Sequence, residues 1–294
     1  NGKRFEKLEL GSKPVVDQIL KDLENADYSV ANVEAKQRKR QPPAPFTTAS
    51  LQQEASHQLG FRAQRTMMIA QQLYEGIALG EDDAVGLITY MRTDSTNVAA
   101  VAQKEAAHYI EAAFGKDLLP PKPRVFKTKT KGAQEAHEAI RPTSVMRTPD
   151  SIKNKLTPEQ LKLYTLIWER FVGSQMADAL YDTLTVDIAA KPNGYMFRAS
   201  GRTLVFPGFL KLNPNLDRES EAEEKLPALK TGDQLTQLAL KPEQHFTEPP
   251  PRYNEASLVK AMETQGIGRP STYAPIISTV IERGYVRLEE RRFV

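Results

Sequence analysis

Tyr90 and Arg92 are the residues of this chain best suited to covalent chemistry on a phosphodiester. They lie in the segment GLITYMRTDS, residues 86–95, which begins as an apolar run and ends in polar residues. Side chains alternate faces along a strand, so we expect the two to point the same way, about 6 to 7 Å apart. A free phenol, with a pKa near about 10, is a weak nucleophile at neutral pH, and a neighbouring cation favours the reactive phenolate. The pair predicts a tyrosine nucleophile with an arginine that stabilises the reacting phosphate.

Thr89 and Asp94 flank this pair and are weaker candidates, Thr89 for positioning and Asp94 for orienting Arg92. A lone Tyr-x-Arg also fits an ordinary half-buried strand that ends in a cap, since many tyrosines cover a core with one end in water. The Tyr-x-Arg pattern alone therefore does not distinguish a tyrosine nucleophile from an ordinary capped strand.

Three further segments carry polar motifs: PPAPFTTASLQ at 42–52, QEAHEAIRPT at 134–143 and METQGIGRPSTYA at 262–274. Together with residues 86–95, these segments resemble the type IA DNA topoisomerases, with bacterial DNA topoisomerase I as the nearest group. No single motif is specific by itself. Four motifs in the family's order, from about residue 42 to the end of the chain, make the resemblance specific.

The resemblance implies an ATP-independent isomerase that cuts one DNA strand by transesterification. Tyr90 would become linked to a 5′ phosphate of a single-stranded segment, the other strand would pass through the break, and religation would relax negative supercoils. One ester replaces another of similar energy, and the sequence contains no Gly-x-x-x-x-Gly-Lys-Ser/Thr nucleotide loop. The implied DNA-binding residues are Arg92, His137, Arg141, Arg269, Ser271 and Thr272.

Each of these DNA contacts has an alternative interpretation. A helix that starts near Arg269, Ser271 and Thr272 offers unpaired amides and a favourable dipole to a phosphate, but an ordinary capped helix has the same sequence. His137 is a candidate phosphate contact with a possible supporting role in catalysis, and it also fits a packing or surface histidine. Arg141 and the neighbouring Glu138 could equally brace their loop.

The resemblance also implies a magnesium ion, held in the complete enzyme by an amino-terminal acidic domain with an Asp-x-Asp cluster, a glutamate and a lysine. That cluster is not in this sequence, and the acidic run at 81–83 follows Gly80 in an apparent turn. The four histidines are scattered without ligand spacing. We therefore expect this chain to bind no metal or cofactor itself, to be a piece of a larger protein whose acidic domain is its partner, and to be inactive alone.

Composition limits the alternatives only broadly. The 294 residues include no cysteine, which removes disulfides, thiol catalysis and thiolate zinc sites together. No apolar run approaches the roughly 20 residues of a membrane helix, so we expect a soluble, intracellular protein. The resemblance implies in addition a monomer in the bacterial cytoplasm, associated with the nucleoid. The formal charge of +3 is only mildly basic. Basic clusters at 36–40 and 122–131 are candidates for DNA-backbone contacts, or solvated surface.

The succession of elements predicts an α+β multidomain fold with three parts. Residues 1–50 and 177–250 would form a β-rich arch or hinge domain, and residues 51–176 an inserted, mainly helical domain that carries the tyrosine. Residues 251–294 would form part of a further helical, DNA-binding domain.

Local signals place the individual elements. We expect strands at 28–35, 202–212 and 234–240, and a hairpin that turns at 192–194. Helices are expected to begin at Ser50, Arg62 and Thr157, after a cap at 94–97, and near Asn254 and Ser271. The helix at 62–74 is expected to carry, on or near its buried side, Met67, Met68, Leu73 and Tyr74.

Three other functions compete with the topoisomerase interpretation. A tyrosine recombinase would need a His-x-x-Arg set upstream of its nucleophile, whereas His137 and Arg141 are one residue too far apart and follow Tyr90. A non-catalytic single-stranded DNA-binding or scaffold module would not need the Tyr90 hydroxyl. A purely structural hinge would show no salt-sensitive DNA binding.

Overall fold

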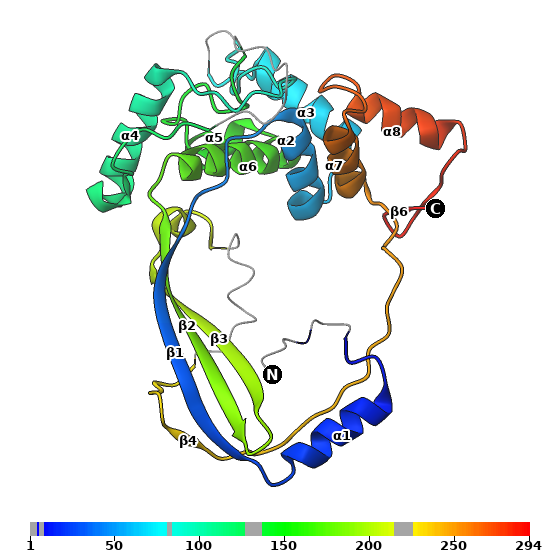
Figure 1. Cartoon of the computed structure of the whole chain (residues 1–294). Coiled ribbons are helices and arrows are strands. Elements are labelled where there is room, and N and C mark those ends of the chain that lie inside the picture. Colours follow the sequence, from blue (N-terminus) through cyan, green and yellow to red (C-terminus); the bar gives the residue numbers. More distant parts are fainter. Residues whose placement is uncertain (1–4, 6–8, 81–83, 127–136, 215–225) are drawn as a thin grey trace. The chain divides into compact units, whose positions relative to one another are not determined.

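The computed structural model describes residues 5, 9–80, 84–126, 137–214 and 226–294, and the chain divides into two compact units (Figure 1). The first unit comprises 1–40, 180–206 and 217–249, and the second comprises 41–179, 207–216 and 250–294. The fold is α+β, with an antiparallel sheet and several helices. Residues 251–294, expected as part of a third domain, pack within the second unit because the helix at 255–265 lies against the one at 48–54.

The first unit is built on a four-stranded sheet with the order β3-β2-β1-β4. Its elements are helix α1 (Lys13–Leu23) and strands β1 (Asp27–Arg40), β2 (Ala179–Lys191), β3 (Tyr195–Phe206) and β4 (Gln234–Leu235). The expected hairpin at 192–194 is confirmed, since β2 and β3 pair antiparallel from Ala190 opposite Tyr195. Leu23, Tyr28 and Ala190 form the centre of a small core under α1.

Two of the expected strands in this part of the chain are shorter than predicted. The strand expected at 202–212 ends at Phe206, because Pro207 has no amide hydrogen to continue the ladder, and a short 3-10 helix η4 (Gly208–Lys211) follows. The strand expected at 234–240 pairs with β1 only at Gln234 and Leu235.

The second unit is mainly helical. Its α-helices are α2 (Thr48–Glu54), α3 (Ala63–Glu75), α4 (Ala100–Phe114), α5 (Pro149–Ile152), α6 (Pro158–Ser174), α7 (Glu255–Gln265) and α8 (Tyr273–Glu282). Shorter elements are the π-helix η1 (Ala55–Leu59), the 3-10 helices η2 (Lys116–Leu118) and η3 (Lys153–Lys155), and the paired strands β5 (Leu288–Glu289) and β6 (Arg292–Phe293). In the described part of the chain, no helix combines the length and apolar character of a membrane span.

Side-chain caps fix the starts of several helices. Thr157 and Gln160 form the capping box of α6, and Asn254 caps α7, both as expected. The expected cap at Ser50 is wrong by one turn: Thr47 is the cap of α2, and the Ser50 hydroxyl accepts the Thr47 amide at 2.9 Å.

Helix α4 begins later than the polar run at 94–97 suggests. Its cap is Ala99, whose amide donates to Glu138 Oε1 at 2.7 Å. The helix start is therefore held by a residue far along the chain. Within the polar run, the amides of Ser95 and Asn97 donate instead to the hydroxyls of Thr93 and Ser95. The prediction was wrong because these hydroxyls form local turns.

The buried side of α3 also differs from the prediction. Leu73 is buried as expected, but Met68 and Tyr74 are 42% and 41% exposed. The buried side chains of this helix are Ala63, Thr66, Ile69, Ala70 and Leu73. The large side chains of Met68 and Tyr74 misled the prediction, because the smaller residues at 63, 66 and 70 complete the helical repeat.

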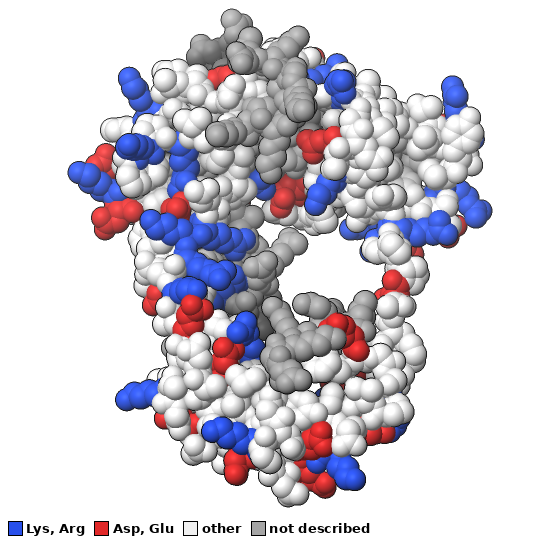
Figure 2. All heavy atoms as spheres, in the orientation of Figure 1, with Lys and Arg blue, Asp and Glu red and all other residues white. Residues whose placement is uncertain are grey.

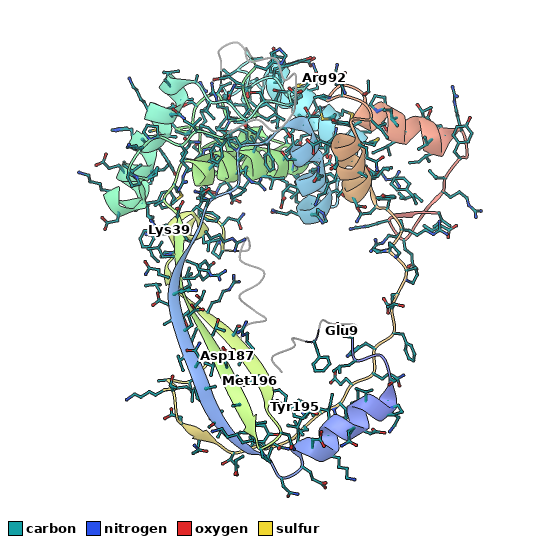
Figure 3. All side chains as sticks on the ribbon, viewed as in Figure 1. Glu9, Lys39, Arg92, Asp187, Tyr195 and Met196 are labelled. Carbon is teal, nitrogen blue, oxygen red and sulfur yellow. The ribbon has the colours of Figure 1, made fainter. Side chains whose placement is uncertain are left out.

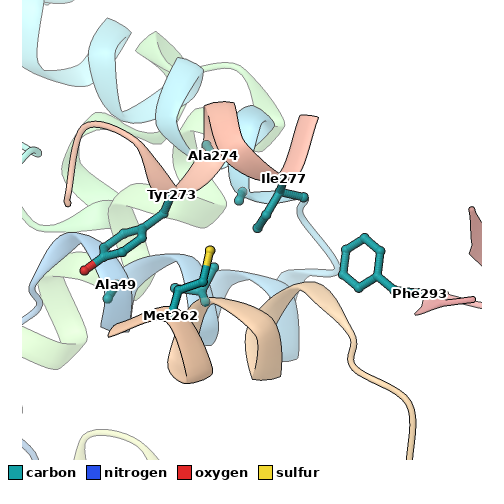
Figure 4. Packing of buried hydrophobic residues seen from close by; sticks show 8 residues of the cluster. Ala49, Met262, Tyr273, Ala274, Ile277 and Phe293 are labelled. Carbon is teal, nitrogen blue, oxygen red and sulfur yellow. The ribbon is translucent and has the colours of Figure 1, made fainter. Parts of the chain in front are cut away.

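A core cluster joins four of the helices around the motif at 262–274. Figure 4 shows Met262 of α7 and Tyr273, Ala274 and Ile277 of α8 packed together with Ala49 of α2. Met67 of α3 packs against the same cluster. The motif at 42–52 is therefore fixed against the one at 262–274 by buried apolar surface.

Candidate active site

The segment that carries Tyr90 is not a strand, and the backbone bends at Thr89, Met91 and Arg92. Its regular pairing is limited to two isolated bridges, Ile77 with Val85 and Ile88 with Pro142. Beyond them, the Thr89 amide donates to the Arg141 carbonyl at 2.9 Å and the Thr93 amide to the Thr48 hydroxyl at 2.9 Å. The expected strand is wrong because two different segments satisfy the backbone here, so no continuous ladder forms.

The side chains of Tyr90 and Arg92 nevertheless both reach the surface. Tyr90 is 45% exposed and Arg92 is exposed, whereas the neighbouring Met91 and Thr93 are only 1% and 2% exposed. Neither the Tyr90 hydroxyl nor the Arg92 guanidinium makes a hydrogen bond or ion pair with any described residue. Arg92 is labelled in Figure 3. A phenol and a guanidinium are thus presented on a backbone that is anchored by buried neighbours.

Thr48 of α2 holds this backbone from one side. Its hydroxyl donates to the Met91 carbonyl at 2.7 Å and accepts the Thr93 amide, and its own amide donates to the Thr93 carbonyl at 2.8 Å. Thr48 is fully buried. The two residues on either side of Arg92 are therefore both tied to the start of α2.

Residues 137–143 hold the same backbone from the other side. The Thr89 hydroxyl donates to the Ala139 carbonyl at 2.7 Å and accepts the Arg141 amide at 3.0 Å. Thr89 thus fixes the position immediately before the nucleophile candidate. His137, expected near the same site, is exposed and lies two residues before Ala139. Residues 134–136 of this motif lie outside the described residues.

Arg141 has the geometry of a bracing residue. It is 9% exposed, its Nη2 pairs with Glu138 Oε2 at 2.6 Å, and its Nη1 donates to the Pro142 carbonyl at 3.0 Å. Since Glu138 also accepts the amide of Ala99, the N-cap residue of α4, this pair links the loop to the start of that helix. A DNA contact would require the guanidinium to leave these partners, and it stays a prediction.

Replacing Arg141 by Ala should lower the free energy of unfolding by about 2 to 3 kcal/mol, because it removes charged hydrogen bonds and leaves Glu138 without its partner. Urea unfolding of the chain would measure this loss. The exposed pair Lys153–Asp150 is the matched control, and Lys153→Ala should cost no more than about 0.5 kcal/mol. Equal losses for the two variants would contradict the bracing role.

Arg269, Ser271 and Thr272 surround the start of α8 and are all exposed. The Arg269 amide donates to the Thr272 hydroxyl at 2.7 Å, and Arg269 Nη1 donates to the Gly268 carbonyl at 2.8 Å. The turn is thereby ordered, with a positive side chain and the positive end of a helix dipole on the same surface.

A pocket brings Arg92 together with this helix start. It measures about 380 Å³ and is lined by Arg92, by Ser271 and by further residues of α3 and α8. One pocket is therefore bordered by Arg92 and Ser271, which come from separate motifs 179 positions apart. The Arg92 guanidinium and the Ser271 hydroxyl can both donate hydrogen bonds to a phosphate there.

Acidic groups lie near the same helix start. Partial desolvation raises the pKa of the Glu263 carboxyl, a hydrogen bond with Gln53 lowers it, and the charge of Asp94 raises it further. Burial likewise raises the pKa of Tyr273, with charge effects from Glu263, Arg269 and Asp94. Asp94 thus lies within electrostatic reach of α8. No described atom pair joins it to Arg92 in an ion pair, so its orienting role stays a prediction.

Tyr74 contacts Tyr90, a contact that the sequence did not predict, because Tyr74 was expected on or near the buried side of α3. Its ring meets that of Tyr90 edge to face, with centroids 5.4 Å apart and planes at 66°. The approach depends on Gly86, where a Cβ atom would lie 2.8 Å from the Tyr74 carbonyl oxygen. The glycine at the start of the GLITYMRTDS motif was the signal, because a residue without a side chain permits such close backbone approach.

The described residues do not fit a magnesium site of their own. No group of three or more His, Asp or Glu side chains that could hold a metal ion occurs among them. The acidic run at 81–83 lies outside the described residues.

A family model described as DNA topoisomerase matches residues 2–294, which is nearly the whole chain. The chain belongs to the type IA DNA topoisomerases. It is similar to full-length topoisomerase I from Thermotoga maritima, with 37% identity and a TM-score of 0.82 over 96% of this chain. The match covers 44% of the Thermotoga chain, so this topoisomerase chain spans less than half the length of that relative.

The first unit of this topoisomerase chain carries the basic cluster at 36–40. Figure 2 shows Lys and Arg side chains gathered over the end of β1 that contains Lys39, which is labelled in Figure 3. Lys36, Arg38 and Lys39 are exposed, and Lys36 pairs with Glu34 at 2.5 Å. The second basic cluster is only partly described, since residues 127–131 lie outside the described residues.

Proposed function

We propose that this chain carries the nucleophile of an ATP-independent type IA topoisomerase that cuts one DNA strand through a 5′-phosphotyrosine. The intact strand would pass through the break before religation, and negative supercoils would relax. The observation that carries the proposal is the exposed pair Tyr90 and Arg92, held on a backbone that two other motifs anchor, beside a pocket that the fourth motif lines.

In the proposed reaction, the Tyr90 oxygen attacks phosphorus and loses its proton. A new phosphorus–oxygen bond forms to Tyr90, the bond to the 3′ oxygen of the neighbouring nucleotide breaks, and that oxygen takes up a proton. Arg92 donates hydrogen bonds to the non-bridging oxygens, where charge accumulates in the transition state. Resealing is the same step in reverse, which is why no nucleotide energy source is required.

The remaining predicted contacts would bind the DNA backbone around this step. Arg269, Ser271 and Thr272 would hold a phosphate at the start of α8, and His137 would meet the backbone beside residues 89–90. The partner is a single-stranded segment of DNA, and the family resemblance supports a monomeric protein in the bacterial cytoplasm.

Magnesium and its carboxylates belong, in this proposal, to an acidic domain of a longer protein. The isolated chain with magnesium is therefore expected to leave supercoiled plasmid unrelaxed on an agarose gel and to form no tyrosine adduct. Adding the acidic domain in trans should restore the adduct on a single-stranded oligonucleotide. Relaxation by the isolated chain would contradict this division of roles.

Tyr74 should act as a positioning residue for Tyr90 in the complete enzyme. Tyr74→Leu removes the edge-to-face contact, worth about 1 kcal/mol, and should lower kcat for cleavage by about 5- to 10-fold with little change in KM. Tyr74→Phe keeps the ring and should restore kcat to within about twofold of the original, since no described group bonds its hydroxyl.

Tyr109 provides the matched control for this experiment. Its ring meets Trp168 edge to face at the same centroid separation of 5.4 Å, away from the Tyr90 segment. Tyr109→Leu should alter stability but leave kcat unchanged. A loss of kcat that is equal in the two leucine variants would show a general packing effect and no positioning role.

A further inference from the structure

The pocket beside Arg92 lies between α3 and α8, and each helix contributes both polar and apolar residues to its lining. Gln64 and Met67 of α3 form one wall, three residues apart and so on one face of the helix. Ser278 and Thr279 of α8 lie on the other wall, with Ser271 at the helix start. Its volume of about 380 Å³ falls within the ~300 to 1,000 Å³ of small-molecule sites.

We propose that this pocket receives one nucleoside adjoining the scissile phosphate, with its base turned out of the stack. The inference rests on the proposed function, which places a phosphate on Arg92. Arg92 itself lines the pocket, and the nucleosides on either side of that phosphate are joined directly to it. One of them must therefore lie near the opening between α3 and α8.

The walls suit a nucleobase. The polarisable thioether of Met67, fixed against the core cluster, offers an apolar surface to the face of a base. The Ser278 hydroxyl donates to Gln64 Oε1 at 3.4 Å, which orients the amide and leaves its two N–H donors without a described acceptor. An oriented amide can pair with the edge of a base as donor and acceptor.

This site gives a physical reason for acting on single-stranded DNA. A base in a duplex must lose its stacking and pairing before it can enter a pocket, whereas a base in a single strand is already free of its partner. The pocket would thus add affinity only for DNA that is unpaired at the cut.

The test uses the complete enzyme and a single-stranded oligonucleotide with one strong cleavage site. An abasic nucleotide is placed on the 5′ or the 3′ side of the scissile phosphate, and the trapped tyrosine adduct is measured over time. We expect cleavage to fall about 10-fold for one of the two positions only, because base–protein contacts are lost there. Gln64→Ala and Met67→Ala should each reduce this sensitivity to about twofold.

Gln72→Ala is the matched control, since Gln72 lies on the same helix and is exposed, but its amide oxygen accepts from Gln160 at 3.0 Å. It should keep the full sensitivity to the abasic nucleotide. Equal cleavage of abasic and normal substrates, or unchanged sensitivity in both Gln64→Ala and Met67→Ala, would overturn the proposal that the pocket binds a nucleoside. Adduct formation in the same experiment would still support the proposed reaction. Failure of the unaltered enzyme to form any Tyr90 adduct would overturn the proposed function instead.

Discussion

Replacing Tyr90 by Phe is expected to abolish the covalent DNA adduct while leaving the fold intact. The ring would remain on the surface against Tyr74, and the lost hydroxyl has no described hydrogen-bond partner, so stability should change by less than about 0.5 kcal/mol. Adduct formation should fall at least about 10³-fold, because the attacking atom is gone. Denaturant trapping of the complete enzyme on a labelled single-stranded oligonucleotide measures this loss.

Tyr285→Phe is the matched control for that experiment. Tyr285 is 70% exposed in the same unit, so its variant removes a surface phenol without touching the segment 86–95. It should form the adduct at the original rate. Unchanged trapping in Tyr90→Phe would instead favour the non-catalytic single-stranded DNA-binding or scaffold module.

The second large effect is expected at Arg92. Arg92→Ala should lower the rate of cleavage by about 10²- to 10³-fold, because a preorganised cation that meets charge in the transition state contributes several kcal/mol. Arg92→Lys should recover only part of the rate, since an ammonium cannot make the bidentate contact of a guanidinium with a phosphate. Single-turnover cleavage at saturating DNA separates this effect from weaker binding.

Arg65 on α3 supplies the control for charge. Its guanidinium is also in the second unit, but it pairs with Glu159 and so is already neutralised. Arg65→Ala should leave the cleavage rate within about twofold. If Arg92→Ala changed only the affinity for DNA and its salt dependence, Arg92 would contact the DNA backbone without stabilising the transition state.

The parts of the fold that were predictable from the sequence are those fixed by neighbouring residues. Thr157 and Asn254 start their helices as expected, and the hairpin at 192–194 forms, since caps and tight turns depend on a few adjacent positions. The start of α4 was not predictable in this way. The amide of its N-cap residue, Ala99, donates to Glu138, 39 residues further along the chain, and no local pattern encodes that contact.

The candidate site also has one part that was predictable from the sequence and one part that was not. The residue types at 90 and 92 pointed to phosphodiester chemistry, but their presentation depends on Thr48 and on residues 139–141, which tertiary packing brings to the segment. The strand prediction failed for that reason. Tyr74 was misassigned because a large aromatic residue on a helix usually belongs to the core, and its exposed contact with Tyr90 arises only from the fold.

The most direct test is to identify the residue that becomes joined to DNA. The complete enzyme would be trapped on a single-stranded oligonucleotide, digested with protease and nuclease, and its phosphonucleotide-bearing peptide sequenced by mass spectrometry. We expect the modification on Tyr90, in the peptide that contains GLITYMRTDS, with the link to a 5′ phosphate. An adduct on any other residue, or a link to a 3′ phosphate, would contradict the account.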